Sequence, residues 1–202
     1  MSRRLFMALT PPDAVRAEVE RATDHLRRAL PQARARYANA ASTHLTLVFL
    51  GQVAEADVPA VRRATLGAAS TTRRFASRTA TLGAFPNPRR PSVLWLGLED
   101  DGGLADLQAT LVEALAGHTA DSGRQRFVPH LTLARVNTRR GIDRDQMAAA
   151  LATFEPAAVP WPVADVVLFE SELRREGARH TPLLTASLGQ PGARPEAGDH
   201  DC

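Results

Sequence analysis

The sequence predicts an α+β fold made of two related halves that face each other across a cleft. The tetrapeptide His-Leu-Thr-Leu occurs twice, at His44 and at His130, each time inside a short apolar run. Around each copy the hydrophobic pattern predicts the order strand, helix, strand, helix, strand. Leu82 follows His44 at the same interval at which Leu168 follows His130. We therefore interpret the chain as an internal duplication, roughly residues 4–88 and 92–170.

Strands are expected where short runs rich in leucine, valine and aromatic residues lie between turn signals. The expected strands are 4–9, 44–50, 75–82, 93–98, 130–136, 163–169 and a short last strand at 183–188. The first histidine strand should end at Gly51. The segment 83–88, Gly-Ala-Phe-Pro-Asn-Pro, should form a loop.

Helices are expected where apolar residues recur at intervals of three and four. The expected helices run over 13–30, 58–66, 104–115 and 143–154. Thr10 should cap the first helix and Pro31 should end it. Asp57 should cap the second helix, whose apolar face includes Leu66. Asp143 should form a capping box with the residue three positions later.

The 202 residues are enough to bury a substantial core, and we expect one bilobal domain over 1–188. Residues 189–202 are rich in Gly, Pro and charge, which predicts a disordered tail. No apolar run reaches the length of a membrane span, and the apolar stretch near the N-terminus is too short for a secretory signal. We expect a cytoplasmic monomer. Cys202 is the single cysteine, which excludes an internal disulfide.

Each repeated strand presents a histidine and a threonine on the same face, because side chains two positions apart point the same way. His44 pairs with Thr46 in this sense, and His130 pairs with Thr132, while the leucines between them face a core. A buried histidine costs free energy unless it is paired. A duplicated core has no packing reason to keep two of them, so the pattern favours a functional site.

The residue types around the two motifs favour acid–base chemistry. Two histidines alone make a poor metal site, and no Asp, Glu or Cys lies at ligand spacing near either one. The chain also lacks a Gly-x-Ser-x-Gly elbow. We therefore expect neither a metal nor a cofactor. One imidazole can accept a proton while the other donates one, and each threonine hydroxyl can donate to a phosphoryl oxygen.

With these motifs the chain resembles the 2H phosphoesterases, and within them the RNA 2′,3′-cyclic phosphodiesterases, also called 2′-5′ RNA ligases. The tandem His-x-Thr motif is the diagnostic feature, and the resemblance runs from Arg4 to about Leu188. It also rests on GAFPNPRRPSVLWLG at 83–97, RFVPHLTLAR at 126–135 and LFESELRREGARH at 168–180. It implies two lobes of antiparallel sheet, with helices outside, around a central groove.

The resemblance assigns roles to the repeated residues by position. It implies that His44 is the proton donor and His130 the proton acceptor. It implies that Thr46 and Thr132 bind the phosphate.

Three further residues have weaker counterparts in the family. Arg135 resembles a substrate-binding arginine, but strict alternation places it opposite His130, so that role requires a bulge, a twist or a strand end. A surface arginine is the alternative. Family members commonly have tyrosine near position 180, where this chain has His180, which could orient substrate instead. Phe85 could stack a nucleobase, although a phenylalanine that anchors its loop is the interpretation we favour.

The activity implied is hydrolysis of RNA 2′,3′-cyclic phosphate ends to 2′-phosphomonoesters. A second activity is reversible 2′-5′ RNA ligation, in which an RNA 5′-hydroxyl takes the place of water. The expected partner is RNA with such ends, tRNA fragments among the candidates. Two alternatives stay open at this point. One is a phosphodiesterase for a small cyclic nucleotide or an ADP-ribose cyclic phosphate. The other is an RNA-end binding module without catalysis, which would not require both histidines.

Overall fold

The computed structural model describes residues 1–118, 127–136, 143–174 and 177–189. The strands are β1 (Ser2–Leu9), β2 (Ala35–Tyr37), β3 (Leu45–Ala54), β4 (Phe75–Phe85), β5 (Val93–Asp100), β6 (His130–Val136), β7 (Pro160–Val163), β8 (Asp165–Arg174) and β9 (Gly177–Ser187). The helices are α1 (Asp13–Ala29), α2 (Val58–Thr71), α3 (Gly103–Ala114) and α4 (Arg144–Ala152), with short 3₁₀ turns η1 (Ala40–Ser42) and η2 (Glu55–Asp57).

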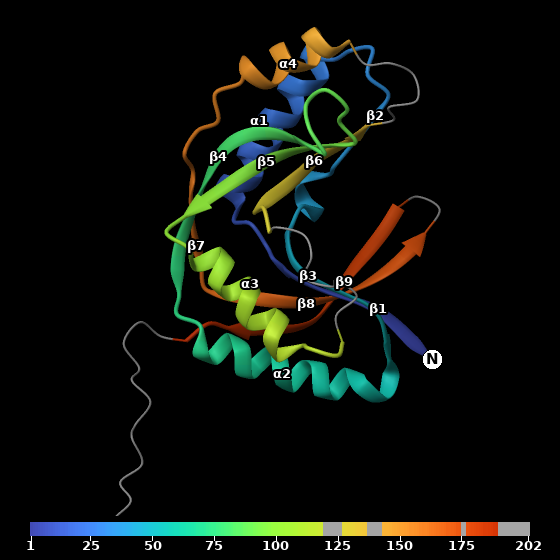
Figure 1. The fold of residues 1–202 in the computed structure, drawn as a ribbon, viewed down its shortest axis with the longest axis vertical. Helices are drawn as coiled ribbons and strands as arrows, with labels where there is room; N and C mark the ends of the chain where they lie inside the picture. The colour runs from blue at the N-terminus through green and yellow to red at the C-terminus, as the bar shows by residue number, and fades with distance from the viewer. Residues whose placement is uncertain (119–126, 137–142, 175–176, 190–202) are drawn as a thin grey trace, which may run out of the picture.

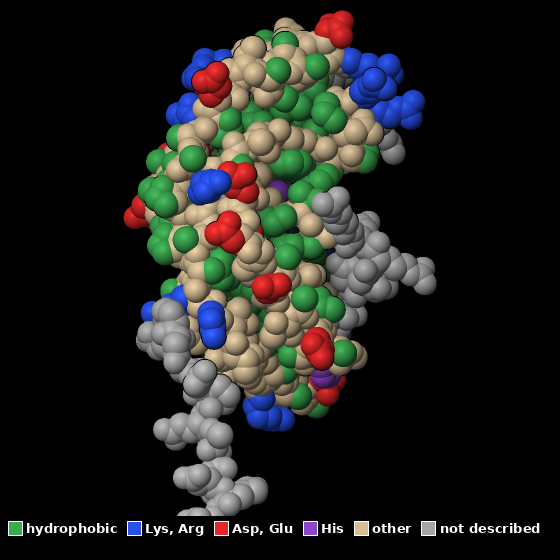
Figure 2. Space-filling model, turned by 60° about the vertical axis from the view of Figure 1, so that its left-hand side comes forward, with side chains coloured by type: hydrophobic (Ala, Val, Ile, Leu, Met, Phe, Trp, Pro, Cys, Tyr) green, Lys and Arg blue, Asp and Glu red, His purple; other side chains and the backbone are tan. Residues whose placement is uncertain are grey.

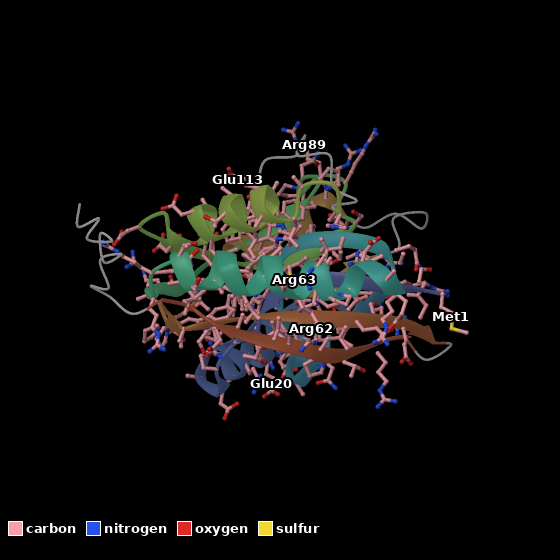
Figure 3. The ribbon with its side chains drawn as sticks, turned by 90° about the horizontal axis from the view of Figure 1, so that it is seen from below. Met1, Glu20, Arg62, Arg63, Arg89 and Glu113 are labelled. Carbon is pink, nitrogen blue, oxygen red and sulfur yellow. The ribbon has the colours of Figure 1, made fainter. Side chains whose placement is uncertain are left out.

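The strands form two antiparallel sheets, which confirms the predicted α+β fold with two lobes. One sheet has the order β3-β1-β8-β9 and the other the order β2-β6-β5-β4-β7. In Figure 1, α2 and α3 lie outside the first sheet, and α1 and α4 lie outside the second. Seen from below, α2 runs across the outer face of its sheet (Figure 3), where Arg62 of α2 donates to the Leu183 carbonyl of β9 at 2.5 Å.

Each sheet combines strands from both predicted halves. β1 pairs with β3 of its own half and with β8 of the second half, while β5 pairs with β6 of its own half and with β4 of the first half. Leu168 lies opposite Met7, and Leu82 lies opposite Leu96. The equal intervals found in the sequence thus correspond to strands in equivalent places of the two sheets. The internal duplication itself stays a prediction.

The core of each lobe lies between its sheet and its helices. Leu45, Leu131 and Leu133, which alternate with the motif residues, are at most 1 % exposed. Leucines of α3 and valines of α1 close the outer sides and are equally buried. Full burial of one such side chain contributes about 1.5–3 kcal/mol. This burial fixes the register of both motif strands, because a slip by one residue would expose their leucines.

The strand boundaries differ from the sequence-based prediction at several places. β3 continues past Gly51, whose φ of 69° suits the ladder irregularity beside it, so this glycine bends the strand and does not end it. β4 includes 83–85, predicted as loop, because Phe85 still pairs with Val93. The expected strand 163–169 is two strands, since Ala164 separates β7 in one sheet from β8 in the other. The last strand begins at Gly177, well before the predicted 183.

One predicted helix cap is wrong, a second is right in position only, and one apolar residue is misplaced. The N-cap of α1 is Pro12 and not Thr10, and no side chain caps this end. Asp57 occupies the N-cap of α2 as predicted, but its side chain makes no capping bond, because η2 already continues into α2 with a helical backbone. Leu66 is 48 % exposed, and α2 buries Val58, Val61, Thr65, Ala68 and Ala69 instead.

Asp143 caps α4 by accepting from the backbone of Asp145 and Gln146, but the Gln146 side chain donates to Ala29 and does not complete the box. Order extends to Gly189, which donates to the Thr72 carbonyl, and residues 190–202 of the predicted tail lie outside the described residues. In the described parts of the chain no helix is both long and apolar enough to cross a membrane.

Candidate active site

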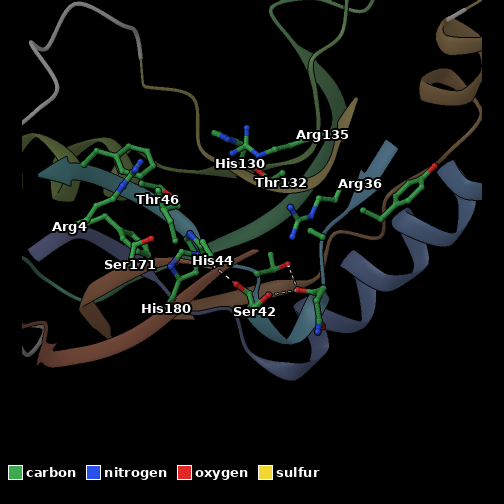
Figure 4. A pocket seen from close by; sticks show the side chains of 18 residues that line it. Arg4, Arg36, Ser42, His44, Thr46, His130, Thr132, Arg135, Ser171 and His180 are labelled. Atoms are coloured by element: carbon green, nitrogen blue, oxygen red, sulfur yellow. Dashed lines mark hydrogen bonds between the residues drawn. The ribbon is translucent and has the colours of Figure 1, made fainter. Parts of the chain in front are cut away.

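A cavity of about 570 Å³ lies between the two lobes, and both repeated motifs line it. Figure 4 shows His130, Thr132 and Arg135 on one side, facing His44 and Thr46 on the other. His130 and Thr132 lie at the start of β6, whereas His44 directly precedes β3 and Thr46 lies at its start. The structure thus brings the two His-x-Thr pairs to one cavity.

Two bulges decide which other side chains reach this cavity. Along β3 the register slips at Leu47, so Phe49 lies on the face of Thr46 and is 48 % exposed. Along β6 the register slips at Leu133, between the pairs Leu94–Ala134 and Trp95–Thr132. An extra residue in a strand shifts the following side chains to the other face. Arg135 therefore lies on the same face as His130 and lines the cavity. This is the bulge that a substrate-binding role for Arg135 required.

The cavity is positively charged. Arg4 of β1 and Arg36 of β2 line it together with Arg135, and no Asp or Glu is present among the described residues that line it. Arg36 lies directly opposite Arg135 in the β2–β6 ladder, and like charges in that relation are destabilising. On the face in Figure 2, acidic and basic side chains are interspersed. The three arginines gathered at the cavity suit an anionic ligand.

Backbone carbonyls fix both histidines in the same tautomer. His44 Nδ1 donates to the Ser42 carbonyl at 3.0 Å, and His130 Nδ1 donates to the Val128 carbonyl at 2.8 Å. A carbonyl can only accept, so in each neutral ring the proton sits on Nδ1. The lone pair then belongs to Nε2, the nitrogen left for a ligand. In each half the accepting carbonyl belongs to the residue two positions before the motif histidine.

The surroundings shift the acidity of both imidazoles in the same direction. Burial lowers the pKa of His44, against the raising effect of its bond to the Ser42 carbonyl, and nearby His180 and His130 lower it further. Burial also lowers the pKa of His130, against the effect of the Val128 carbonyl, with a smaller lowering from Arg135. Both rings are therefore easier to deprotonate in the protein than in water.

Aromatic rings hold each histidine in place. The His44 ring lies 5.0 Å from the ring of Phe6 and 5.0 Å from that of His180, edge to face in the second case. The His130 ring meets Phe85 edge to face at 4.9 Å. His180 also lines the cavity, from β9, whereas Phe85 lies behind His130 and is absent from the lining. Phe85 thus supports an imidazole by direct contact, while stacking of Phe85 on a base stays a prediction.

Sequence reasoning missed Arg4, Arg36 and Phe49. β2 has only three residues, too few for a periodic pattern, so Arg36 fell in an expected loop. Arg4 and Phe49 lie on predicted strands, but which face they occupy depends on bulges that carry no clear signature here. The one signal in the sequence that could have pointed to these arginines is that segments rich in arginine precede the motif strands.

Two lobes of antiparallel sheet that share one arginine-lined cavity, with a histidine and a threonine from each lobe, define a bilobal two-histidine class of protein. This chain belongs to the 2′-5′ RNA ligase superfamily, whose family model matches residues 11–175.

Individual relatives and solved structures agree with this membership. The chain is 30 % identical over 184 residues to the RNA 2′,3′-cyclic phosphodiesterase of Methanothermobacter thermautotrophicus, covering 91 % of this chain and 97 % of that protein. It is 32 % identical over 207 residues to the enzyme of that name from Thermus thermophilus, covering 96 % and 98 %. The crystal structure of TT0787 of Thermus thermophilus matches with a TM-score of 0.74 and 28 % identity, covering 94 % of this chain and 100 % of that one. Escherichia coli LigT complexed with phosphate matches with a TM-score of 0.68 and 27 % identity, covering 94 % and 99 %.

Proposed function

We propose that this chain hydrolyses RNA 2′,3′-cyclic phosphate ends to 2′-phosphomonoesters through paired acid and base histidines. The observation that carries the proposal is the pair of imidazoles, each fixed at Nδ1, at one cavity lined by three arginines. Relatives similar over nearly their whole length are named RNA 2′,3′-cyclic phosphodiesterase, and a related LigT structure holds phosphate, which supports the same chemistry. We further propose that the protein acts as a cytoplasmic monomer on RNA fragments, those of tRNA included.

In the proposed reaction His130 accepts the proton of a water molecule, whose oxygen forms a bond to phosphorus. The bond from phosphorus to the 3′ oxygen breaks, and His44 donates the proton that this oxygen needs. Thr46 and Thr132 donate hydrogen bonds to the non-bridging oxygens. The 2′ oxygen keeps the phosphate. If an RNA 5′-hydroxyl attacks the phosphorus of the cyclic phosphate in place of water, the same two proton transfers yield a 2′-5′ linkage.

The arginines and the supporting rings have defined parts in this proposal. Arg135 faces the bound phosphate and stabilises the charge that develops on its oxygens. Phe85 keeps the His130 ring in orientation by edge-to-face contact. His180, beside His44, contacts the ribose whose 3′ oxygen departs from phosphorus on that side.

Hydrolysis is expected to survive exhaustive chelation. Within the described residues no three His, Cys, Asp or Glu side chains are grouped so as to hold a metal ion. The test is incubation of an oligonucleotide with a 2′,3′-cyclic end in excess EDTA, with the position of the product phosphate assigned by ³¹P NMR. Unchanged turnover to a 2′-phosphate supports the proposal. Lost turnover that zinc or manganese restores would show that a metal supplies part of the chemistry.

The pH profile of kcat/KM is expected to be bell-shaped, with its maximum on the acid side of pH 6.5, the ordinary imidazole pKa. Activity falls at low pH as the base is protonated, and falls at high pH as the acid loses its proton. Because the pKa of each ring is lowered by burial, both limbs move toward acid in the free enzyme, and each limb reports the coupled pair. The profile of kcat should lie at higher pH, since a bound phosphodiester anion favours the imidazolium. Rates with a dinucleotide cyclic phosphate across pH test this, and a kcat/KM maximum above pH 6.5 contradicts it.

A further inference from the structure

A second cavity, of about 540 Å³, lies on the other side of the His44–His180 ring pair. It is walled by Val167 and Phe169 of β8, by Pro182 and Thr185 of β9, and by Thr10 just after β1. It shares Ser42, Thr43, His44, Ala178 and His180 with the first cavity. The two cavities therefore adjoin each other, and the rings of His44 and His180 line both.

The chemistry of the second cavity differs from that of the first. Its walls combine flat apolar surface from Val167, Phe169 and Pro182 with hydroxyl groups of serine and threonine. Apart from the two histidines, Arg179 is its one charged residue, and no acid occurs among the described residues of its lining. Apolar walls with a few polar groups suit a nucleobase and its sugar, and the arginine suits a neighbouring phosphate. The first cavity, with three arginines, is built for the phosphate itself.

We propose that the second cavity is a subsite for the penultimate nucleoside of the RNA, one nucleotide before the cyclic phosphate. The inference rests on the proposed function, because that function places the terminal ribose, with its departing 3′ oxygen, beside His44. The chain continues from the 5′ oxygen of that ribose, so the next nucleoside needs room beyond His44. The second cavity offers it, at a volume within the range of roughly 300–1,000 Å³ usual for small-ligand sites.

If the second cavity is this subsite, the protein should prefer a dinucleotide substrate to a mononucleoside one. Side chains that fill the cavity should abolish the preference. A dinucleotide with a 2′,3′-cyclic end should have a kcat/KM about tenfold above that of the mononucleoside 2′,3′-cyclic phosphate with the same terminal base, as stacking of one base allows. Thr185→Trp and Thr10→Trp fill the cavity from opposite walls, and both residues are exposed. Each variant should bring the ratio of the two kcat/KM values close to one. Leu66→Trp, at an exposed position on α2, is the matched control and should leave the ratio unchanged.

Calorimetry with the products gives a second readout. The dinucleotide 2′-phosphate should bind the wild-type protein about tenfold more tightly than the mononucleoside 2′-phosphate, and equally tightly in either filled variant. If the wild-type protein hydrolyses both substrates with nearly equal kcat/KM, the subsite proposal is wrong and the proposed function stands. A preference that persists in both filled variants, or a loss that is equal on the two substrates, also overturns the subsite proposal. Failure to hydrolyse either substrate contradicts the proposed function itself.

Discussion

Replacement of either His44 or His130 by alanine is expected to lower kcat/KM for a 2′,3′-cyclic phosphate by about 10²–10⁴-fold, the usual contribution of one positioned proton transfer. Each ring is held at Nδ1 by a carbonyl, which leaves Nε2 as the nitrogen that exchanges the proton, and alanine removes that nitrogen. Single-turnover hydrolysis of a dinucleotide substrate measures the chemical step directly.

The double variant is expected to be barely slower than either single variant, because an acid and a base that act in one transition state form a unit. Thr46→Ala should cost less, about 1.5–3 kcal/mol for one hydrogen bond to a charged group. His25→Ala is the matched control: His25 lies on α1, where its Nε2 donates to the Ala150 carbonyl at 2.7 Å, away from the cavity. Near-normal turnover by either site variant would mean that the paired mechanism is wrong.

The parts of the fold that sequence could predict are those set by periodicity. Alternation placed Leu131 and Leu133 in the core and therefore His130 and Thr132 on the other face, and burial confirms the first statement. The repeat placed the two motifs in equivalent strands. These two facts predict that both pairs face one cleft, and all four side chains do line the cavity between the lobes.

What sequence could not predict depends on contacts between distant segments. Arg135 reaches the cavity through a slip in the β5–β6 register, which is set by Trp95 and Thr132 pairing across the sheet. His180 meets His44 because β9 extends much farther toward the groove than its apolar pattern indicated. The exchange of β4 and β8 between the sheets is likewise a matter of pairing partners, which local patterns do not specify.

One close approach in the sheet under His130 was also hidden from the sequence. Gly83 of β4 lies directly opposite Trp95 of β5, and the indole folds across the glycine. A Cβ atom at position 83 would lie far closer to the nearest indole carbon than van der Waals contact allows. The same indole lies 5.2 Å from the ring of Phe85 and 6.3 Å from that of His130. The glycine therefore gives Trp95 the space from which it supports the proposed base.

Gly83→Ala is expected to lower the free energy of unfolding by about 1–3 kcal/mol, since the displaced indole must strain its neighbours. It should also lower kcat, because Phe85 and His130 pack against the same indole. Thermal or urea unfolding measures the first effect, and hydrolysis of the cyclic dinucleotide at saturation measures the second.

Gly67→Ala is the matched control for this change. Gly67 lies in α2, and an added Cβ there meets no atom within 4 Å. In a helix interior alanine is favoured over glycine by roughly 0.5–1 kcal/mol, so this variant should be slightly more stable and fully active. In the Gly83→Ala background, Trp95→Leu should restore part of the lost stability, because the smaller side chain leaves room for the new methyl group. The double variant should then lose clearly less than the sum of the two single variants. Additive losses would mean that Gly83 and Trp95 do not compete for the same space, and that the indole is not what requires glycine at this position.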